Sequence, residues 1–143
     1  MAYTIKKVEV WACDTLNKPG MLARVLEALT EAGAQLEFLI GRRITETTSR
    51  IYVAPLRTKK QKQAAADVGL VPAAGMNAVR LEGPDRRGLG AEIARAVAAA
   101  GINIRGISAA ALARRAVFYL AFAEPAEAAR AAAILRKLLR GKR

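Results

Sequence analysis

The sequence predicts an α+β protein built from two tandem β-α-β-β-α-β units, and three observations support this. The chain has 143 residues, enough for two small domains of about 70 residues each. Asn17 to Leu36 recurs as Asp85 to Ile104, with the turn, both glycines and the polar residue after the second glycine at one constant spacing. In each copy, β-rich segments flank an amphipathic helix. We therefore expect one domain over residues 1–75 and another over 76–143.

The first copy begins with a β-rich segment over residues 8–13, followed by a helix after Gly20. Apolar residues recur in that helix at the spacing of one buried stripe, namely Leu22, Val25, Leu26 and Leu29. Pro19 suits the first helical turn and Gly33 suits a left-handed C-cap. Strands are predicted over residues 36–40 and 50–54, with a turn at 45–49 between them and a basic helix over 58–68.

The second copy repeats this order, with strands over 78–82, 102–108 and 116–123 and helices over 89–100 and 125–139. Its first helix carries the stripe Leu89, Ile93 and Val97. Residues 69–77 should form the fourth strand of copy one, running into the first strand of copy two. This order predicts antiparallel sheets with both helices on one face, the ferredoxin-like arrangement.

Copy two shows no fourth strand of its own, because residues 140–143 are too short and too basic to supply one. The connecting strand or another subunit should fill that edge of the sheet. A homodimer is the resulting expectation, since unpaired backbone groups at a sheet edge can pair with a second chain.

Several chemistries are excluded by composition. The chain has no histidine, which removes the Ser-His-Asp triad, the Cys-His pair and imidazole metal ligands. The lone Cys13 excludes an intrachain disulfide and a paired-cysteine zinc site, and it is expected to be a small buried hydrophobe. We expect no metal and no cofactor. The charged N-terminus and the short longest uncharged stretch, residues 68–79, predict a cytoplasmic protein without a membrane segment.

The formal net charge of +12 raises the possibility of a nucleic-acid partner. The positive residues are scattered singly among alanines except around residues 59–62 and 136–143. This distribution favours a solvated basic surface over a polyanion site.

The turn before the first helix of each copy is the best candidate for a binding site. Gly20 and Gly88 let a ligand approach the backbone, where first-turn N–H groups and the positive end of the helix dipole favour an anion or a carboxylate. In the alternative interpretation these glycines only make a tight turn, while Asn17 and Asp85 cap the helices.

These residues resemble the ACT domain, a small-molecule regulatory module of amino-acid metabolic enzymes. Its pattern is an Asn/Asp-x-Pro-Gly turn, an amphipathic helix, and Gly-(Val/Ile)-Asn-Ile opening the second strand. The chain has residues 17–20 and 33–36 in copy one, and 85–88 and 101–104 in copy two. Arg87 stands in place of the proline and Gln35 in place of the asparagine. The resemblance covers nearly the whole chain as two tandem copies without an attached enzyme.

The resemblance implies an amino-acid site at an interface between two such domains, without catalysis, acting on a regulated enzyme partner. The implied ligand-binding residues are Asn17, Gly20, Met21 and Gln35 in copy one, and Asp85, Gly88, Leu89 and Asn103 in copy two. Copy two is expected to be the stronger site, because Asp85 supplies a negative charge for the ligand ammonium. Taken alone, Asn103 is equally compatible with a surface amide on an edge strand.

Two alternatives share this topology. An RNA-recognition module would place stacking aromatics on the third strand, where the sequence has Phe118, Tyr119 and Phe122, but their alternation favours a core face and makes nucleic acid the less favoured partner. An acylphosphatase would pair Arg86 or Arg87 with Asn103. The other features of that enzyme family are not evident, so no enzymatic activity is expected.

Overall fold

The structure is a computed structural model that describes residues 2–142. The chain forms two compact units. The first unit comprises residues 9–73, and the second unit comprises residues 2–8 together with 74–142. The fold is α+β with antiparallel strand pairing, which confirms the predicted fold class.

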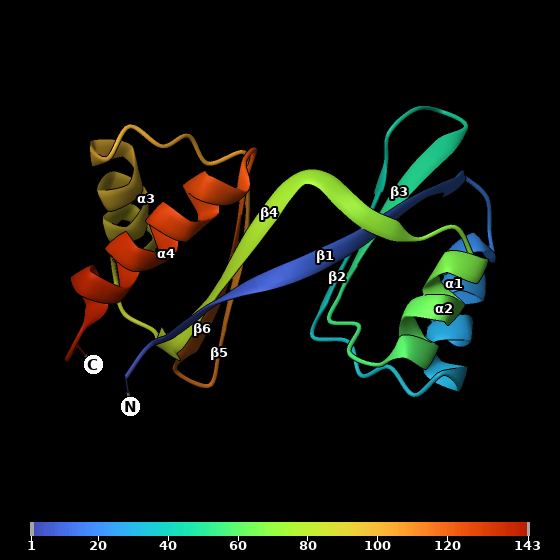
Figure 1. Ribbon diagram of the computed structural model, residues 1–143, viewed down its shortest axis with the longest axis horizontal. Coiled ribbons are helices and arrows are strands. Elements are labelled where there is room, and N and C mark those ends of the chain that lie inside the picture. The colour runs from blue at the N-terminus through green and yellow to red at the C-terminus, as the bar shows by residue number, and fades with distance from the viewer. Residues whose placement is uncertain (1, 143) are drawn as a thin grey trace. The chain divides into compact units, whose positions relative to one another are not determined.

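The first unit contains β1 (Thr4–Leu16, from residue 9 onwards), α1 (Met21–Glu31), β2 (Phe38–Arg43), β3 (Thr48–Ala54) and α2 (Lys59–Asp67). The strands pair in the order β2-β3-β1, and both helices cover one face of them (Figure 1). Val25 and Leu29 of α1 pack with Ile51 and Val53 of β3 to form the core. The side chain of Thr58 caps α2 as part of a capping box, which confirms the start of the predicted basic helix.

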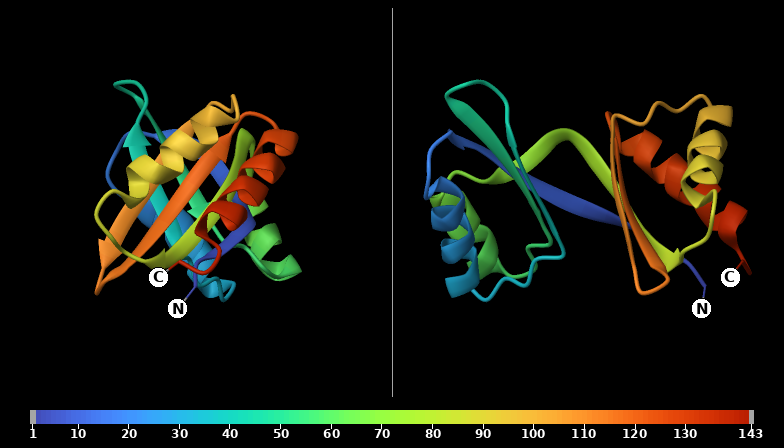
Figure 2. Two further views of the ribbon diagram at one scale, coloured as in Figure 1. Left: turned by 90° about the vertical axis from the view of Figure 1, so that its left-hand side faces the viewer. Right: turned by 180° about the vertical axis from the view of Figure 1, so that it is seen from behind.

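The second unit contains β4 (Val71–Pro84, from residue 74 onwards), α3 (Leu89–Ala99), β5 (Gly106–Leu112), β6 (Arg115–Phe122) and α4 (Pro125–Leu139). The strand order is β4-β6-β5, with α3 and α4 on one face (Figure 2). The predicted α3 stripe of Leu89, Ile93 and Val97 is confirmed, because all three side chains are buried. The alternating side chains of β6, Phe118, Leu120 and Phe122, also lie in this core.

The link between the units is one strand, as predicted, because β4 begins at Val71 and continues to Pro84. The expectation about the missing fourth strand is wrong. Strand β1 lies beside β4 in the sheet order, and its first residues belong to the second unit. Ile5 packs in the core of that unit, and Arg136 donates to the carbonyl of Ile5 at 2.8 Å. The sequence reading missed this because it began the first strand at Val8.

Four further predictions have mixed outcomes. Gly33 takes a left-handed conformation with φ +84° at the end of α1, as expected of a C-cap glycine. Pro19 lies before the N-cap Gly20, so it is outside the helix rather than in its first turn. Leu22 is 42% exposed and is not part of the buried stripe. Cys13 is buried as expected, and burial raises the pKa of its thiol.

Within the described part of the chain, no helix combines the length and the apolar character needed to cross a membrane.

Candidate functional site

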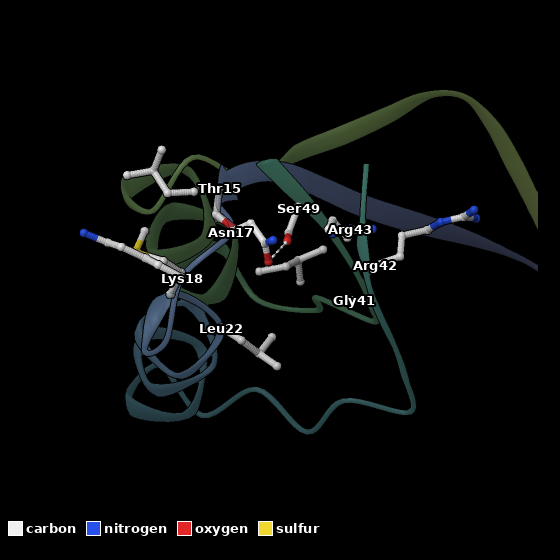
Figure 3. A pocket seen from close by; sticks show the side chains of 11 residues that line it. Thr15, Asn17, Lys18, Leu22, Gly41, Arg42, Arg43 and Ser49 are labelled. Carbon is white, nitrogen blue, oxygen red and sulfur yellow. Dashed lines mark hydrogen bonds between the residues drawn. The ribbon is translucent and has the colours of Figure 1, made fainter. Parts of the chain in front are cut away.

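The first unit has a pocket of about 300 Å³ where β1 ends and α1 begins (Figure 3). The turn between these two elements, the start of α1, and the adjoining ends of β2 and β3 form its walls. The lining residues are Thr15, Leu16, Asn17, Lys18, Met21, Leu22, Gly41, Arg42, Arg43, Ser49 and Ile51. Two of the residues predicted for a ligand site, Asn17 and Met21, therefore lie in one pocket.

Strand register determines which side chains face this pocket. Thr15 pairs with Ser49, and Ser49 pairs with Arg43, so these three side chains form a polar row across β1, β3 and β2. The next row towards the core contains Cys13, Ile51 and Gly41. Ile51 is packed beneath the helices. Since side chains two residues apart share a face, the polar row lies on the same face, beyond the apolar core.

Asn17 fixes the shape of the pocket by joining the β1–α1 turn to the β2–β3 hairpin. Its side-chain amide donates to the carbonyl of Glu46 at 3.2 Å, and the Ser49 hydroxyl donates to its Oδ1 at 3.1 Å (Figure 3). Its backbone N–H donates to the carbonyl of Thr47 at 2.8 Å. The Asn17 side chain is thus held by the hairpin and is not directed to the helix N-terminus.

Glycine occupies the N-cap position of the helix in both units. Gly20 has φ +91° and Gly88 has φ +83°, a left-handed conformation that other residues adopt at a cost. Neither α1 nor α3 has a side-chain cap hydrogen bond. The interpretation of Asn17 and Asp85 as helix caps is therefore wrong. Without a side-chain cap, the first-turn N–H groups beside Met21 are available to solvent or to a ligand.

The charges around the pocket are positive. Arg43 lies next to Ser49, while the charged ends of Lys18 and Arg42 extend away from the Asn17–Ser49 pair (Figure 3). None of the three has an ion pair among the described residues. No carboxylate lines the pocket.

The nearest acidic residue along β1 is committed elsewhere. Asp14 forms an ion pair with Arg50 at 2.6 Å. Both residues project from the face opposite to Thr15 and Ser49, since they are neighbours of those residues in paired strands. The hydrogen bond from Arg50 holds the pKa of Asp14 below its ordinary value, which keeps this carboxylate ionised and paired.

Gln35 does not join Asn17. It lines a different pocket, of about 500 Å³, at the C-terminal end of α1 and the start of β2. Most of that lining is apolar, with Leu26, Leu29, Leu36, Phe38 and Leu39 among its residues. The predicted four-residue site of copy one is therefore divided: Asn17, Met21 and the adjacent Gly20 lie together, and Gln35 lies apart.

The region of the second unit that corresponds to the pocket has different side chains. The row that matches Thr15, Ser49 and Arg43 consists of Gly83, Ala116 and Ala111, so every polar side chain is replaced by a small one. The aromatic ring of Tyr3 covers the Cα of Gly83, and its hydroxyl donates to the carbonyl of Pro84 at 2.6 Å.

A second aromatic ring, that of Phe118, also lies in this region of the second unit. Phe118 lies against Gly90 of α3, at 3.6 Å from where a Cβ would stand. Gly90 corresponds to Leu22 of the first unit by the constant repeat spacing.

The predicted residues of copy two lie in different surroundings. Leu89 is 2% exposed and belongs to the core. Asp85 is exposed and its backbone N–H donates to the carbonyl of Arg114, and Asn103 is exposed. Gly88 provides the left-handed N-cap.

Arg86, the residue that an acylphosphatase-like arrangement would need, is paired with Glu92 at 2.8 Å. This hydrogen bond holds the pKa of Glu92 below its ordinary value. Residues 2–142 contain no group of three or more histidine, cysteine or acidic side chains placed to hold a metal ion.

Sequence reasoning missed Arg43, Gly41 and Ser49. They are brought to the pocket by the register of the β2–β3 hairpin, and the sequence does not determine that register by itself. One feature of the sequence could have identified Arg43: Arg42 and Arg43 are consecutive residues just before the predicted turn. Because side chains alternate between the two faces of a strand, one of these arginines must lie on the face that carries the helices.

Solved structures with the same fold include several regulatory proteins. A protein of Bacteroides thetaiotaomicron is 16% identical, with a TM-score of 0.78, over 94% of this chain and 90% of that one. The regulatory subunit of aspartate kinase from Thermus thermophilus, in its ligand-free form, is 17% identical with a TM-score of 0.63, over 96% of each chain. The aspartokinase alpha and beta subunits match at 16% identity and a TM-score of 0.62, over 96% of each chain. At these identities the likeness shows the fold.

By sequence, the chain matches no protein-family model and no curated protein.

Proposed function

We propose that this chain is a tandem ACT protein, with one ACT-like repeat over residues 1–75 and one over 76–143, that binds a small amino acid and transmits its occupancy through domain or subunit contacts. The protein acts without a catalytic step of its own. The observation that carries the proposal is the pocket of the first unit, where Asn17, the first turn of α1 and a polar row on the sheet converge.

The ligand carboxylate would bind at the start of α1, next to Gly20. The absence of a Cβ at Gly20 leaves open space there, and the first-turn N–H groups together with the helix dipole favour a negative group. Ser49 and Thr15 add hydroxyls, and Met21 and Ile51 provide apolar surface for a short side chain. Such a combination of a few polar groups with apolar walls is typical of small-molecule sites.

We place the functional site in the first unit rather than the second. The place equivalent to the pocket lacks all three polar side chains and is covered by Tyr3 and Phe118. Asp85, Gly88 and Leu89 belong to the turn and the start of α3, Leu89 is buried in the core, and Asn103 lies beyond the other end of that helix. From the sequence, the negative charge of Asp85 had favoured copy two as the stronger binding site. The proposal now favours copy one.

The proposed partner is a regulated enzyme in the cytoplasm, contacted by a homodimer of this chain. Solved proteins with this fold include a regulatory subunit of aspartate kinase, which supports a regulatory role. In such a role the ligand acts through its different affinity for two states of the assembly.

The nucleic-acid alternative has less support. Phe118 and Tyr119 are each 8% exposed, so neither ring is available to stack on a base. Arg80 donates to the Tyr119 hydroxyl at 3.0 Å, which fixes that side chain within its own sheet.

Calorimetric titration of the full chain with each of the twenty amino acids, with and without magnesium and calcium, tests the proposal. At least one amino acid should bind with a heat change that saturates. Saturation should be lost in the variant Asn17→Ala and retained in Asp85→Ala, its match in the second unit. Absence of binding across the whole panel would remove the proposed function and leave the fold unchanged.

A further inference from the structure

We propose that the pocket of the first unit selects a dicarboxylate, and that Arg43 is the residue that recognises its second carboxylate. This inference rests on the proposed function, since it names the ligand class of the same site. It starts from the charges of the lining, which comprise Lys18, Arg42 and Arg43 and no acidic side chain.

The position of Arg43 distinguishes it from the other two cations. Register places Arg43 in the polar row with Ser49 and Thr15, on the face that carries the buried Ile51. Arg42 lies opposite Arg50 in the strand register, so it projects from the other face of the sheet. Its guanidinium extends away from the Asn17–Ser49 pair in Figure 3. A guanidinium forms paired hydrogen bonds with a carboxylate, so its place on the pocket side favours a planar anion.

Two anion-binding groups stand at different walls of the pocket. The start of α1 with its free first-turn N–H groups forms one wall, and Arg43 on β2 forms another. Arg43 is exposed and has no ion pair among residues 2–142, so its guanidinium is available to a second carboxylate of a ligand. A dicarboxylate satisfies both walls.

Space for a connecting carbon chain exists between these walls. Gly41 also lines the pocket, in the row of Cys13 and Ile51, and a Cβ at Gly41 would meet no atom within 4 Å. The backbone of Gly41 is not left-handed, so conformation does not require glycine there. The residue at the equivalent position of the second unit is Ala109, which shows that the fold accepts a side chain at this position.

The pocket also excludes cationic ligands. A lysine-like ligand would bring a second positive charge to a wall that already carries Arg43, no carboxylate lines the pocket, and Asp14 of β1 is paired with Arg50 on the other face. The α-ammonium of an amino acid has only neutral acceptors here, such as Oδ1 of Asn17. Dicarboxylic amino acids and the corresponding 2-oxo or plain dicarboxylic acids share the chemistry that the two anion-binding walls recognise.

The test is calorimetry on the full chain with three groups of ligands: aspartate and glutamate; oxaloacetate, 2-oxoglutarate and succinate; and lysine, threonine and alanine. We expect saturable binding in the first or second group, at least tenfold tighter than in the third. The group that binds more tightly tells whether the dicarboxylate carries an ammonium, and binding confined to the second group would support the dicarboxylate preference while overturning the amino-acid ligand of the proposed function. Binding restricted to the third group would overturn the inference while leaving the proposed function intact. Absence of binding in all three groups, together with the rest of the amino-acid panel, would overturn both.

Matched variants test the role of Arg43. Arg43→Gln should weaken dicarboxylate binding by about tenfold to a hundredfold, the range for a lost charge-assisted hydrogen bond. Arg24→Gln, at an exposed residue of α1 outside the lining, should change binding by less than about threefold, through general electrostatics only. Gly41→Leu should abolish binding by filling the pocket, whereas Gly41→Ala should retain the native melting temperature. Equal effects of the two arginine variants, or intact binding in a folded Gly41→Leu protein, would overturn the assignment.

Discussion

The hydroxyl of Ser49 donates a hydrogen bond to Oδ1 of Asn17 at 3.1 Å, across the pocket of the first unit. This contact joins β3 to the turn that opens α1, two segments separated by 32 positions in the sequence. Asp85 takes the place of Asn17 in the second unit, and Ala116 takes the place of Ser49, so the contact has no counterpart there. This hydrogen bond is thus a feature of the first unit, where the pocket lies.

Asn17→Asp should separate the two roles of this side chain. Aspartate can still accept from Ser49 but cannot donate to the carbonyl of Glu46, and it brings a negative charge to an otherwise cationic pocket. We expect ligand binding to weaken at least tenfold with a change in melting temperature of only a few degrees. The control is Asp85→Asn in the second unit, which should leave binding unchanged. Weaker binding in Asp85→Asn than in Asn17→Asp, measured by calorimetry, would return the site to the second unit.

Gly20→Ala should destabilise the first unit through backbone strain alone. A Cβ at Gly20 would meet nothing within 4 Å, but φ is +91°. The cost should be roughly 1 to 2 kcal/mol in the free energy of unfolding, measured by urea denaturation. Gly41→Ala is the matched control, because its backbone is not left-handed, and it should be neutral within about 0.5 kcal/mol. Equal costs for the two variants would contradict the assigned conformation of Gly20.

Acid should destabilise the protein partly through Glu82. Hydrogen bonds from Arg80 at 2.8 Å and from Arg115 hold the pKa of Glu82 below its ordinary value. A carboxyl group with a lower pKa in the folded state adds stability at neutral pH, and this contribution is lost as the pH falls through that pKa.

The free energy of unfolding should therefore fall as the pH is lowered from about 5 towards 3, and Glu82→Gln should make this dependence shallower. Glu27→Gln is the control, because Glu27 is an exposed carboxylate without an ion pair among the described residues. An unchanged pH profile in the Glu82 variant would show that these hydrogen bonds do not persist in solution.

Phe118→Leu tests the nucleic-acid alternative without unfolding the protein. Phe118 packs in the core of the second unit and against Gly90, so the smaller side chain should lower the free energy of unfolding by about 1 kcal/mol. Binding of single-stranded RNA should be weak, lost at moderate salt and equal in the variant and the native protein. RNA binding that resists salt and fails specifically in Phe118→Leu would favour the alternative.

Homodimer formation stays a prediction, with a different basis from the sequence argument. The N-terminal part of β1 already lies beside β4, so the edge strands of the two units are β2 and β5. β5 carries Ile107 and Leu112, which are 55% and 84% exposed. Light scattering should give twice the 15.3 kDa of one chain, and Ile107→Lys should reduce it to one, since a charge on an edge strand opposes pairing. A monomeric native protein at micromolar concentration would contradict this.

The sequence predicted most of the fold because each element carries its own local signal. The α3 stripe, the basic helix over residues 58–68 and the β6 alternation depend on residues close to one another in the chain, and all three are confirmed. The role of residues 4–8 was missed because only long-range pairing with β4 reveals it.

The site was harder to predict than the fold for a related reason. Motif spacing identified Asn17 and Met21 but gave no information on which hairpin residues face them. The register of β2 against β3 brings Arg43 and Ser49 to the pocket, and the rings of Tyr3 and Phe118 fill the equivalent place in the second unit. The sequence repeat made the two turns look alike, whereas the strands beneath them carry different side chains.

Nuclear magnetic resonance of the ¹⁵N-labelled full chain, titrated with the ligand that calorimetry finds to bind most tightly, tests the central claim most directly. We predict that the backbone amide signals of Met21, Gly41, Arg43 and Ser49 shift along one saturating curve, while those of Gly88, Leu89 and Asn103 stay in place. Shifts concentrated at Gly88, Leu89 and Asn103, with the first-unit signals unmoved, would contradict the account.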